Sequence, residues 1–323
     1  MTKHFLAVLA LALPVPLAAQ AQPEPVDALT AEIQLADADR FVAMFEQTEG
    51  RPTAEEVQRL YLDPGSYGVA VFTPYRITSA ENLAAAIAAD PASYRKAIDV
   101  CLPQVRAANG DLRSIYLGLQ GALPDANLPQ VYVLFGAGNS GGTADLGAQV
   151  LGLEVLCGLA EDHGGLRRWL RHFFAHETIH ALQQEAGANA DDDALLRNVL
   201  AEGAADFIAR LVTGQEPDEA KAEFGMARET ELFARFLADI DIVRDHGEND
   251  AGDHATASQA ERRWVGNYGT APDGWPGELG YWLGLRIWEA NWNAAEDKRA
   301  VLQRMLTLED PRGVLATWAA RSD

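Results

Sequence analysis

Apolar residues in the second half of the chain recur at intervals of three and four, which is the period of an amphipathic α-helix. Gly187 and Gly214 follow two of these periodic segments, where C-terminal helix caps are expected. Two polar or glycine-rich segments, 246–258 and 267–277, are expected to be loops. The pattern predicts helices at residues 166–186, 192–212, 217–243, 278–293, 295–307 and 310–320.

The first half of the chain combines helical patterns with a short β region. Residues 128–135 and 148–156 are rich in β-branched and apolar side chains, and both are predicted to be strands of one β-hairpin. Residues 67–77 alternate in a way that favours a strand or an extended loop. Helices are predicted at residues 37–49, 53–62, 79–89 and 91–109. The expected fold is therefore α+β and mainly α-helical, with a small sheet before the helix at 166–186.

Residues 1–21 have the pattern of a signal peptide. Lys3 precedes an apolar run, and Ala19-Gln20-Ala21 matches the small-x-small cleavage pattern. A short membrane anchor is the alternative, but the apolar run is short and is followed by prolines. We expect an exported chain, periplasmic or secreted, without a stable membrane anchor. Residues 22–323 are expected to form one domain, with a helical and β part at about 22–160 and a helical part at about 161–323.

The formal net charge of −21 narrows the range of partners. Such an acidic chain repels nucleic acid and anionic membrane surfaces. The two cysteines, Cys101 and Cys157, belong to no metal-binding or redox motif. They are either a disulfide, which an oxidising compartment permits, or two buried thiols that pack as small apolar groups.

The strongest chemical signal is the sequence His176-Glu177-Thr178-Ile179-His180. On a helix, residues four apart lie on nearly the same face, about 6 Å apart along the axis. Two imidazoles at this spacing can bind one tetrahedral zinc ion, with the intervening glutamate beside them. The apolar stripe of the same helix, Leu166, Trp169, Leu170 and Phe173, leads directly to this motif. The motif is therefore expected on the buried face, where charged groups must be paired or bind a metal.

A third ligand is expected from the next helix. Glu202 and Asp206 are one turn apart there, and Gly203, Ala204 and Ala205 would allow close helix packing. Glu202 can bind the metal, and Asp206 can accept the second ring N–H of His176. The alternatives are an ordinary helix surface for the two acids and a pair of satisfied core histidines. His172 extends the histidine row and is a less favoured ligand.

Here the sequence resembles a known group of enzymes. HExxH followed by ExxxD on a second helix is similar to the gluzincin pattern of thermolysin-like zinc metallopeptidases. The resemblance implies a zincin-like fold, His176, His180 and Glu202 as zinc ligands, Glu177 as catalytic base and Asp206 as the partner of His176. It also implies that a strand before the HExxH helix pairs with the peptide substrate. Residues 148–154 stand in that position, so Gly152 and Glu154 are expected to bind substrate.

A second resemblance extends over nearly the whole chain after residue 21. The chain is similar to bacterial predicted zinc-dependent proteases related to the gliding-motility lipoprotein GldB, although it lacks the lipidation cysteine of lipoprotein members. The matching residues are Tyr61-Leu62-Asp63-Pro64-Gly65-Ser66 with Arg76-Ile77, Val131-Tyr132-Val133, Asn139-Ser140-Gly141-Gly142-Thr143, Gly152-Leu153-Glu154, His176-Glu177 with His180 and Gln183, and Leu279-Gly280-Tyr281-Trp282-Leu283-Gly284 with Arg286-Ile287.

Two further features bear on the site. The glycine-rich segment 136–142 lacks the lysine and hydroxyl residue of a phosphate-binding loop, so it is either a flexible turn or the rim of a cleft. Tyr281 and Arg286 are candidates for stabilising an oxyanion, and the alternative for both is packing and surface charge.

The expected function is an exported zinc-dependent hydrolase, most simply a peptidase that uses a zinc-activated water and Glu177 as general base. The substrate would be a peptide or protein. Hydrolysis of a non-peptide amide or ester is one alternative. A noncatalytic cell-envelope assembly factor that retains the fold is the other.

Overall fold

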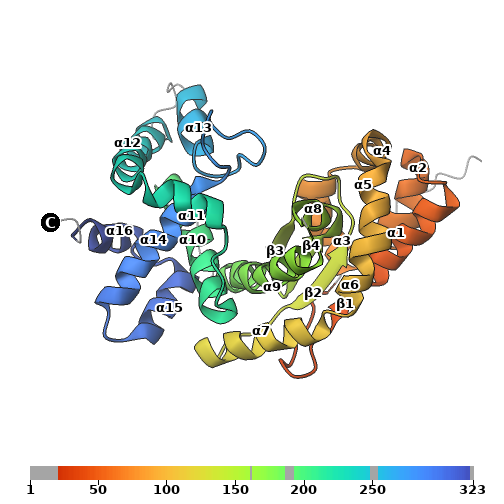
Figure 1. Cartoon of the computed structure of the whole chain (residues 1–323), viewed down its shortest axis with the longest axis horizontal. Coiled ribbons are helices and arrows are strands. Elements are labelled where there is room, and N and C mark those ends of the chain that lie inside the picture. The colour runs from red at the N-terminus through yellow and green to blue at the C-terminus, as the bar shows by residue number, and fades with distance from the viewer. Residues whose placement is uncertain (1–20, 161, 186–192, 248–253, 321–323) are drawn as a thin grey trace, which may run out of the picture.

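The computed structural model describes residues 21–160, 162–185, 193–247 and 254–320. The signal peptide expected at residues 1–21 lies outside the described residues apart from Ala21. Within the described ranges, no helix combines the length and the apolar character that crossing a membrane requires. Figure 1 shows an N-terminal part with the sheet and a C-terminal helical part on either side of the long helix α9 (His163–Glu185).

The N-terminal part surrounds its sheet with short helices. They include three π-helical segments, labelled η. These elements are α1 (Ala36–Gln47), α2 (Ala54–Val57), η1 (Gln58–Leu62), α3 (Tyr67–Phe72), η2 (Thr73–Ile77), α4 (Ala80–Ala89), α5 (Pro91–Lys96), η3 (Ala97–Cys101), α6 (Leu102–Arg106), α7 (Asn109–Ala122) and α8 (Leu153–Leu159).

The prediction for residues 67–77 was wrong, because this segment is helical as α3 and η2. Ser66 caps α3, with its Oγ accepting a hydrogen bond from the backbone N–H of Gly68 at 3.1 Å. The cap offsets the low helix propensity of Val69, Val71 and Thr73 that favoured a strand. The helix α7 was not predicted at all. It packs against α9 and buries Leu112, Ile115, Tyr116 and Leu119.

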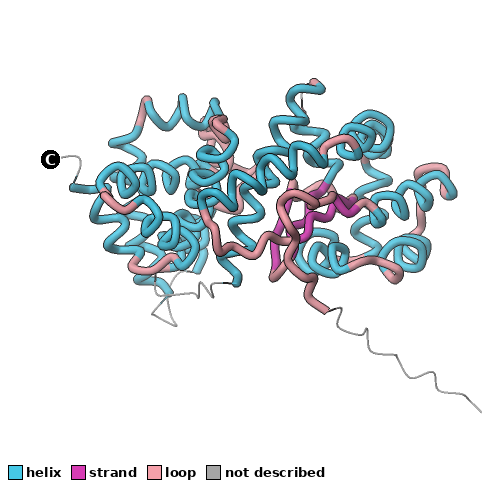
Figure 2. The backbone as a smooth tube through the Cα atoms, turned by 90° about the horizontal axis from the view of Figure 1, so that it is seen from below, coloured by secondary structure: helices cyan, strands magenta, loops and turns pink. Residues whose placement is uncertain are grey.

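The sheet has four strands in the order β1-β2-β4-β3. They are β1 (Ile33–Gln34), β2 (Gln130–Leu134), β3 (Gly142–Asp145) and β4 (Ala148–Gly152). The predicted hairpin of β2 with β4 was wrong, because these strands are parallel and β3 returns antiparallel to β4. β4 lies between β2 and β3 with all five residues buried, and helices cover the sheet (Figure 2). The mainly helical α+β class is therefore confirmed.

The C-terminal part contains helices and loops and no strand within the described residues. The single helix predicted at 217–243 is two helices, and residues 254–258, predicted as a loop, begin another. The remaining predicted helices are present, as is the loop at 267–277. The helices are α10 (Ala194–Thr213), α11 (Glu219–Met226), α12 (Glu229–Gly247), α13 (His254–Arg262), α14 (Leu279–Ala294), α15 (Lys298–Thr307) and α16 (Pro311–Ala319).

Two glycines let α10 and α14 cross with their backbones in contact. A Cβ added at Gly203 would lie 2.1 Å from the carbonyl carbon of Gly284. One added at Gly284 would lie 2.0 Å from the backbone oxygen of Val199. Gly203, which the sequence suggested for packing against α9, thus makes this close approach to α14 instead. The crossing fixes α14, and with it Tyr281, beside the helices that carry HExxH and Glu202.

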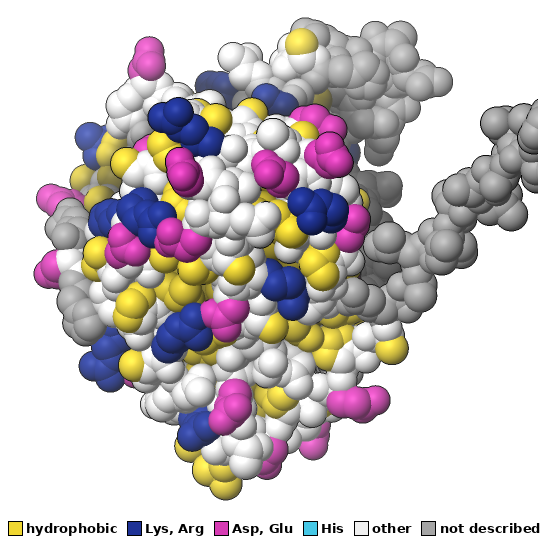
Figure 3. All heavy atoms as spheres, turned by 90° about the vertical axis from the view of Figure 1, so that its right-hand side faces the viewer, with side chains coloured by type: hydrophobic (Ala, Val, Ile, Leu, Met, Phe, Trp, Pro, Cys, Tyr) yellow, Lys and Arg dark blue, Asp and Glu magenta, His cyan; other side chains and the backbone are white. Residues whose placement is uncertain are grey.

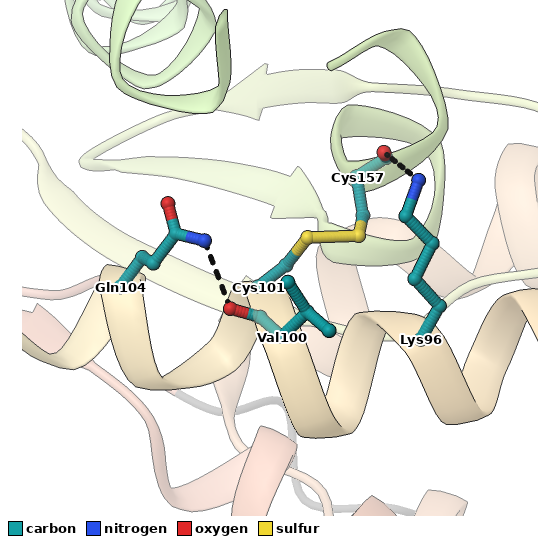
Figure 4. The surroundings of a disulfide bond; sticks show 5 residues. All are labelled: Lys96, Val100, Cys101, Gln104 and Cys157. Carbon is teal, nitrogen blue, oxygen red and sulfur yellow. Dashed lines mark hydrogen bonds between the residues drawn. A yellow bond between two sulfur atoms is a disulfide. The ribbon is translucent and has the colours of Figure 1, made fainter. Parts of the chain in front are cut away.

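Cys101 and Cys157 form a disulfide, which settles the choice left open by the sequence. The bond joins η3 to α8 within the N-terminal part (Figure 4). Beside it, the Nζ of Lys96 donates to the backbone oxygen of Cys157 at 3.4 Å. The crosslink therefore anchors α8 to η3, which comes before strand β2 in the chain.

Loss of this disulfide is expected to lower the free energy of unfolding by about 4 kcal/mol, because the bond closes a long loop in the unfolded chain. The sequence separation of its ends is 56. Urea unfolding of the oxidised protein and of a Cys101→Ser/Cys157→Ser variant measures the difference. Reductant should shift the wild-type midpoint and leave that of the double variant unchanged. Equal midpoints for the two proteins without reductant would contradict the prediction.

Charges of both signs are mixed on the face at the N-terminal end of the molecule. Figure 3 shows Lys and Arg side chains interspersed there with Asp, Glu and apolar side chains. A phosphate backbone needs a continuous basic surface. This face offers none, in agreement with the acidic composition.

Candidate metal centre

Helices α9 and α10 bring three ligand atoms to one point. The Nε2 atoms of His176 and His180 are 3.0 Å apart. The Oε2 atom of Glu202 lies 3.0 Å from Nε2 of His180 and 3.3 Å from Nε2 of His176. A tetrahedral zinc ion bound at about 2.0–2.1 Å separates its ligand atoms by about 3.3 Å. The three predicted ligands therefore form a group that could hold a metal ion.

The outer nitrogens of both rings already have hydrogen-bond acceptors. Nδ1 of His176 lies 2.8 Å from Oδ1 of Asp206, the partner expected from the sequence. Nδ1 of His180 lies 2.9 Å from Oε1 of Gln183, whose amide nitrogen donates to the backbone oxygen of Met305. A carboxylate or amide oxygen only accepts, so each Nδ1 carries the hydrogen. The Nε2 atoms of both histidines then have lone pairs that face the carboxylate of Glu202. A cation bound between these two nitrogens and the carboxylate oxygen satisfies all three acceptors.

The charges around this point also favour a cation. Burial alone would raise the pKa of Glu202, but His180 and His176 hold it far below its usual value. Burial alone would lower the pKa of His176, but hydrogen bonds with Asp206 and Glu202 raise it well above its usual value. The carboxylates of Glu202 and Asp206 therefore make this point electrostatically favourable for positive charge.

A second group of possible ligands contains His172, His176 and Asp206. Nε2 of His172 lies 3.5 Å from Oδ1 of Asp206, and burial lowers the pKa of His172 to about 4. Within this group, Asp206 is already the hydrogen-bond partner of Nδ1 of His176, at 2.8 Å. The group with His180 and Glu202 therefore fits a metal better.

Glu177 lies buried beside the ligands, as the helical stripe predicted. Burial raises its pKa, while His176, His180 and Arg76 lower it. A Cβ added at Gly142, the first residue of β3, would lie 2.3 Å from Oε1 of Glu177. The carboxylate therefore rests directly against the end of the glycine-rich segment.

A cleft of two adjoining cavities surrounds Glu177, with volumes of about 400 and 590 Å³. Asn139–Gly142 lines the first cavity, so the glycine-rich segment is the rim of a cleft. Its other walls include the apolar residues Val155, Leu159, Trp169 and Phe173. The second cavity is bounded by β3 and by polar residues of α9 and α10. Both cavities share Arg76, Gly142, His176, Glu177 and Tyr281.

The two oxyanion candidates on α14 lie apart. The ring of Tyr281 stacks on that of His176 with 5.8 Å between centroids and an interplanar angle of 3°. Arg286 instead forms ion pairs with Glu229 and Glu289 and is not part of the cleft lining. Five residues on a helix correspond to a rotation of about 140°, so the two side chains point to different faces. The structure brings Tyr281 to the site and not Arg286.

Gly152 and Glu154 do not lie on an edge strand. β4 is an inner strand, and Glu154 belongs to the helix α8 that follows it. The buried carboxylate of Glu154 accepts backbone hydrogen bonds from Gly136 at 3.0 Å and Gly138 at 3.1 Å. The backbone N–H of Gly152 donates to the oxygen of Gly141 at 3.0 Å. Both residues therefore hold the glycine-rich segment in place, and the edge strand is β3.

Three residues of the site were not assigned from local pattern. Gln183 lies on the same helical face as His180, three residues on, and this spacing was a usable signal. Arg76 and Gly142 come from segments far from the motif in sequence. In the sequence, Arg76 was noted only for the resemblance to GldB-related proteases, and Gly142 for that resemblance and as the end of the glycine-rich segment; neither was given a chemical role.

If Glu177 acts as a base in hydrolysis, Gly142→Ala is expected to lower the activity by about 100-fold, because the added methyl group displaces Glu177 and small misplacements at a reacting centre cost this much. The zinc content should stay unchanged, since the three atoms nearest to the added Cβ all belong to Glu177. Steady-state kinetics and metal analysis test both points. Gly121→Ala is the matched control, because its Cβ would meet nothing within 4 Å. Full activity in Gly142→Ala would contradict the assigned position of the base.

Comparison with known proteins adds no relative to this description: no family model, curated protein or solved structure matches the chain. Any assignment of function therefore rests on the chemistry and geometry of the cleft, together with the sequence motif.

Proposed function

We propose that the protein is a zinc-dependent peptidase of the gluzincin type. The observation that carries the proposal is the convergence of two imidazole nitrogens and one carboxylate oxygen within 3.0–3.3 Å, beside the buried Glu177. Three protein ligands leave a fourth position open, as in catalytic rather than structural zinc sites. A long cleft passes this position on both sides.

The residues around the cleft have complementary tasks in hydrolysis. When bound, zinc supplies a Lewis acid that makes water reactive near neutral pH. Glu177 takes a proton from the attacking water and delivers it to the leaving amine. Burial raises the pKa of Glu177, which suits a group that must both accept and release a proton.

In this proposal Tyr281 stabilises the developing oxyanion. Its ring lies parallel to that of His176, and burial raises the pKa of the phenol well above its usual value. The hydroxyl group therefore stays protonated and available as a hydrogen-bond donor. We assign this role to Tyr281 alone, because Arg286 pairs with Glu229 and Glu289 outside the cleft lining.

The strand β3 is a template for an extended substrate. It pairs with β4 on one side, and its residues Gly142, Thr143 and Ala144 line the second cavity. Within the described residues no strand pairs with its other side. A peptide that adds to this edge gains backbone hydrogen bonds next to Glu177 with little sequence selectivity. This extended edge favours a peptide over a small amide or ester.

An exported location belongs to the same proposal. The disulfide between Cys101 and Cys157 supports it, since such bonds persist in oxidising compartments. The buried Glu177 argues against a noncatalytic assembly factor. Burying a carboxyl group is costly, and no described residue forms an ion pair with Glu177 that would make it a structural element.

The test combines metal analysis with substrate profiling of the purified protein. We expect one zinc ion per chain and internal or terminal cleavage of a random peptide library, identified by mass spectrometry. A panel of small amides and esters should be cleaved more slowly. Cleavage of that panel alone would identify a non-peptide hydrolase, and absence of zinc after chelator-free purification would exclude the proposed site.

A further inference from the structure

The cationic side chain of Arg76 lines both cavities of the cleft. The Nε atom of Arg76 is buried and makes no hydrogen bond. Among the described residues, no hydrogen bond or ion pair engages its guanidinium group. Arg197, which also lines the second cavity, instead donates to the backbone oxygen of Leu308 at 3.4 Å. A buried donor left unpaired costs free energy, and a ligand that pairs with it recovers that cost.

The local backbone holds Arg76 in an unusual conformation. Arg76 lies in the π-helical segment η2, which ends where the N–H of Thr78 donates to the oxygen of Thr73 at 2.7 Å. Thr78 itself has a positive φ of 63°. The side-chain amide of Asn139 donates to the backbone oxygen of Arg76 at 3.0 Å. Such π-helical turns and strained residues concentrate at functional sites, where surrounding structure maintains them.

Arg76 lies at the junction of the two cavities. It lines both of them, together with Gly142, His176, Glu177 and Tyr281. Among the described residues Arg76 forms no ion pair with Glu177, although both line the two cavities. The guanidinium is therefore available to a substrate whose reacting bond lies at Glu177.

The rest of the cleft carries more carboxylates than cations. Asp206, Asp218 and Glu278 line the first cavity together with Lys221, which pairs with Asp218 at 3.6 Å. Glu202 lines the second cavity together with Arg197. A substrate carboxylate is repelled there unless a cation receives it. The planar fork of an arginine matches the two oxygens of a carboxylate, whereas the single oxyanion of the reaction needs only the donor that Tyr281 provides.

We propose that Arg76 binds a carboxylate group of the substrate next to the bond that is cleaved. The inference rests on the proposed function and specifies its substrate class. Two sources of the carboxylate share this chemistry: the free C-terminus of a peptide, and the side chain of an aspartate or glutamate near the scissile bond. The first would make the protein act at C-terminal ends, and the second would make it select acidic sequences.

The test measures kcat and KM on matched peptide libraries. One pair differs in a free C-terminal carboxylate or an amide, and the other contains Asp and Glu or Asn and Gln. Wild type should favour the carboxylate member of one pair. Arg76→Gln should lose about 10- to 100-fold in kcat/KM on that member, mainly through KM, as expected for hydrogen bonds to a charged group. The neutral member should change little.

Three further proteins complete the experiment. Arg76→Lys keeps the charge without the fork and should recover part of the preference. Arg51→Gln removes an exposed arginine and should behave as wild type. Glu177→Gln is used in an equilibrium binding assay with dansyl-labelled forms of the same libraries. It should bind the carboxylate member more tightly than the neutral member, and a second substitution, Arg76→Gln, should remove this difference.

The outcomes separate the carboxylate role of Arg76 from the proposed peptidase function. If wild type cleaves no peptide, the proposed function fails, while the binding assay still reports on Arg76. If wild type shows no preference in either pair, or if Arg76→Gln weakens acid and neutral substrates equally, the carboxylate role is overturned. An equal loss in kcat alone would instead show that Arg76 acts on the reaction centre.

Discussion

Glu177→Gln is expected to reduce peptide hydrolysis by about 100- to 10,000-fold, which is the range that general acid–base catalysis supplies. Glutamine keeps the shape of the side chain and cannot accept the proton of the attacking water. Zinc content should remain that of wild type, because Glu177 is not one of the three converging ligands. Kinetics on a cleaved library peptide, with metal analysis of the same samples, measures both quantities.

The same substitution has an expected effect on stability. Burial disfavours the charged form of Glu177, so a neutral glutamine should leave the melting temperature unchanged or slightly higher. Loss of activity together with retained stability would separate a catalytic role from a structural one. Glu223→Gln is the control, since Glu223 is exposed on α11. Turnover equal to wild type in Glu177→Gln would remove the enzymatic interpretation.

Removal of zinc is expected to abolish hydrolysis and to destabilise the fold. Zinc at 1,000 times its dissociation constant contributes about 4 kcal/mol to the folded state. In a chain of this size that loss lowers Tm by several degrees, and added zinc should restore both activity and Tm. Scanning calorimetry before and after chelation measures the change. An unchanged Tm and rate after complete chelation would contradict a metal at this position.

Two histidine variants decide which ligand group holds the metal. His180→Ala removes a ligand and should abolish stoichiometric zinc binding. His172→Ala should keep one zinc per chain, because His172 belongs only to the second group. Asp206→Asn should keep the metal with about 10- to 100-fold lower affinity, as is typical when the partner of a ligating histidine is changed. Loss of zinc in His172→Ala alone would favour the second group.

Zinc affinity should also fall as the pH is lowered. Burial alone lowers the pKa values of His176 and His180, but Asp206 and Glu202 raise that of His176, and Glu202 raises that of His180. Below these raised values a proton occupies the metal-free site, and zinc must displace it. Zinc titrations at two pH values either side of neutrality measure this competition.

The candidate metal ligands were predictable because their signals are local. The spacing of His176 and His180 and the apolar stripe before them act within one helix, where residue periodicity determines which side chains share a face. Glu202 and Asp206 follow on the next helix, so only one helix pairing was needed to bring the four side chains together. Asp206 lies where that pairing placed it, at 2.8 Å from His176.

The substrate side of the cleft was not predictable in the same way. The position of β3 depends on β4, which pairs parallel with β2. The residues of a single strand do not indicate which other strand it pairs with. Glu154 was misplaced for this reason, since it looked like the end of an edge strand. Arg76 reaches the cleft through a π-helical turn in a segment whose alternating pattern indicated a strand or an extended loop.

The crossing of α10 and α14 limits how this sequence can change in evolution. Gly203 and Gly284 touch through their backbones, so a methyl group at either position has no space. No substitution at one glycine can compensate for a larger residue at the other, because both are already the smallest residue available. Substitution of Gly203 or Gly284 is therefore incompatible with this helix crossing, whichever substrate a descendant protein comes to use. Both glycines are therefore required together for the helix crossing that holds Tyr281 over His176.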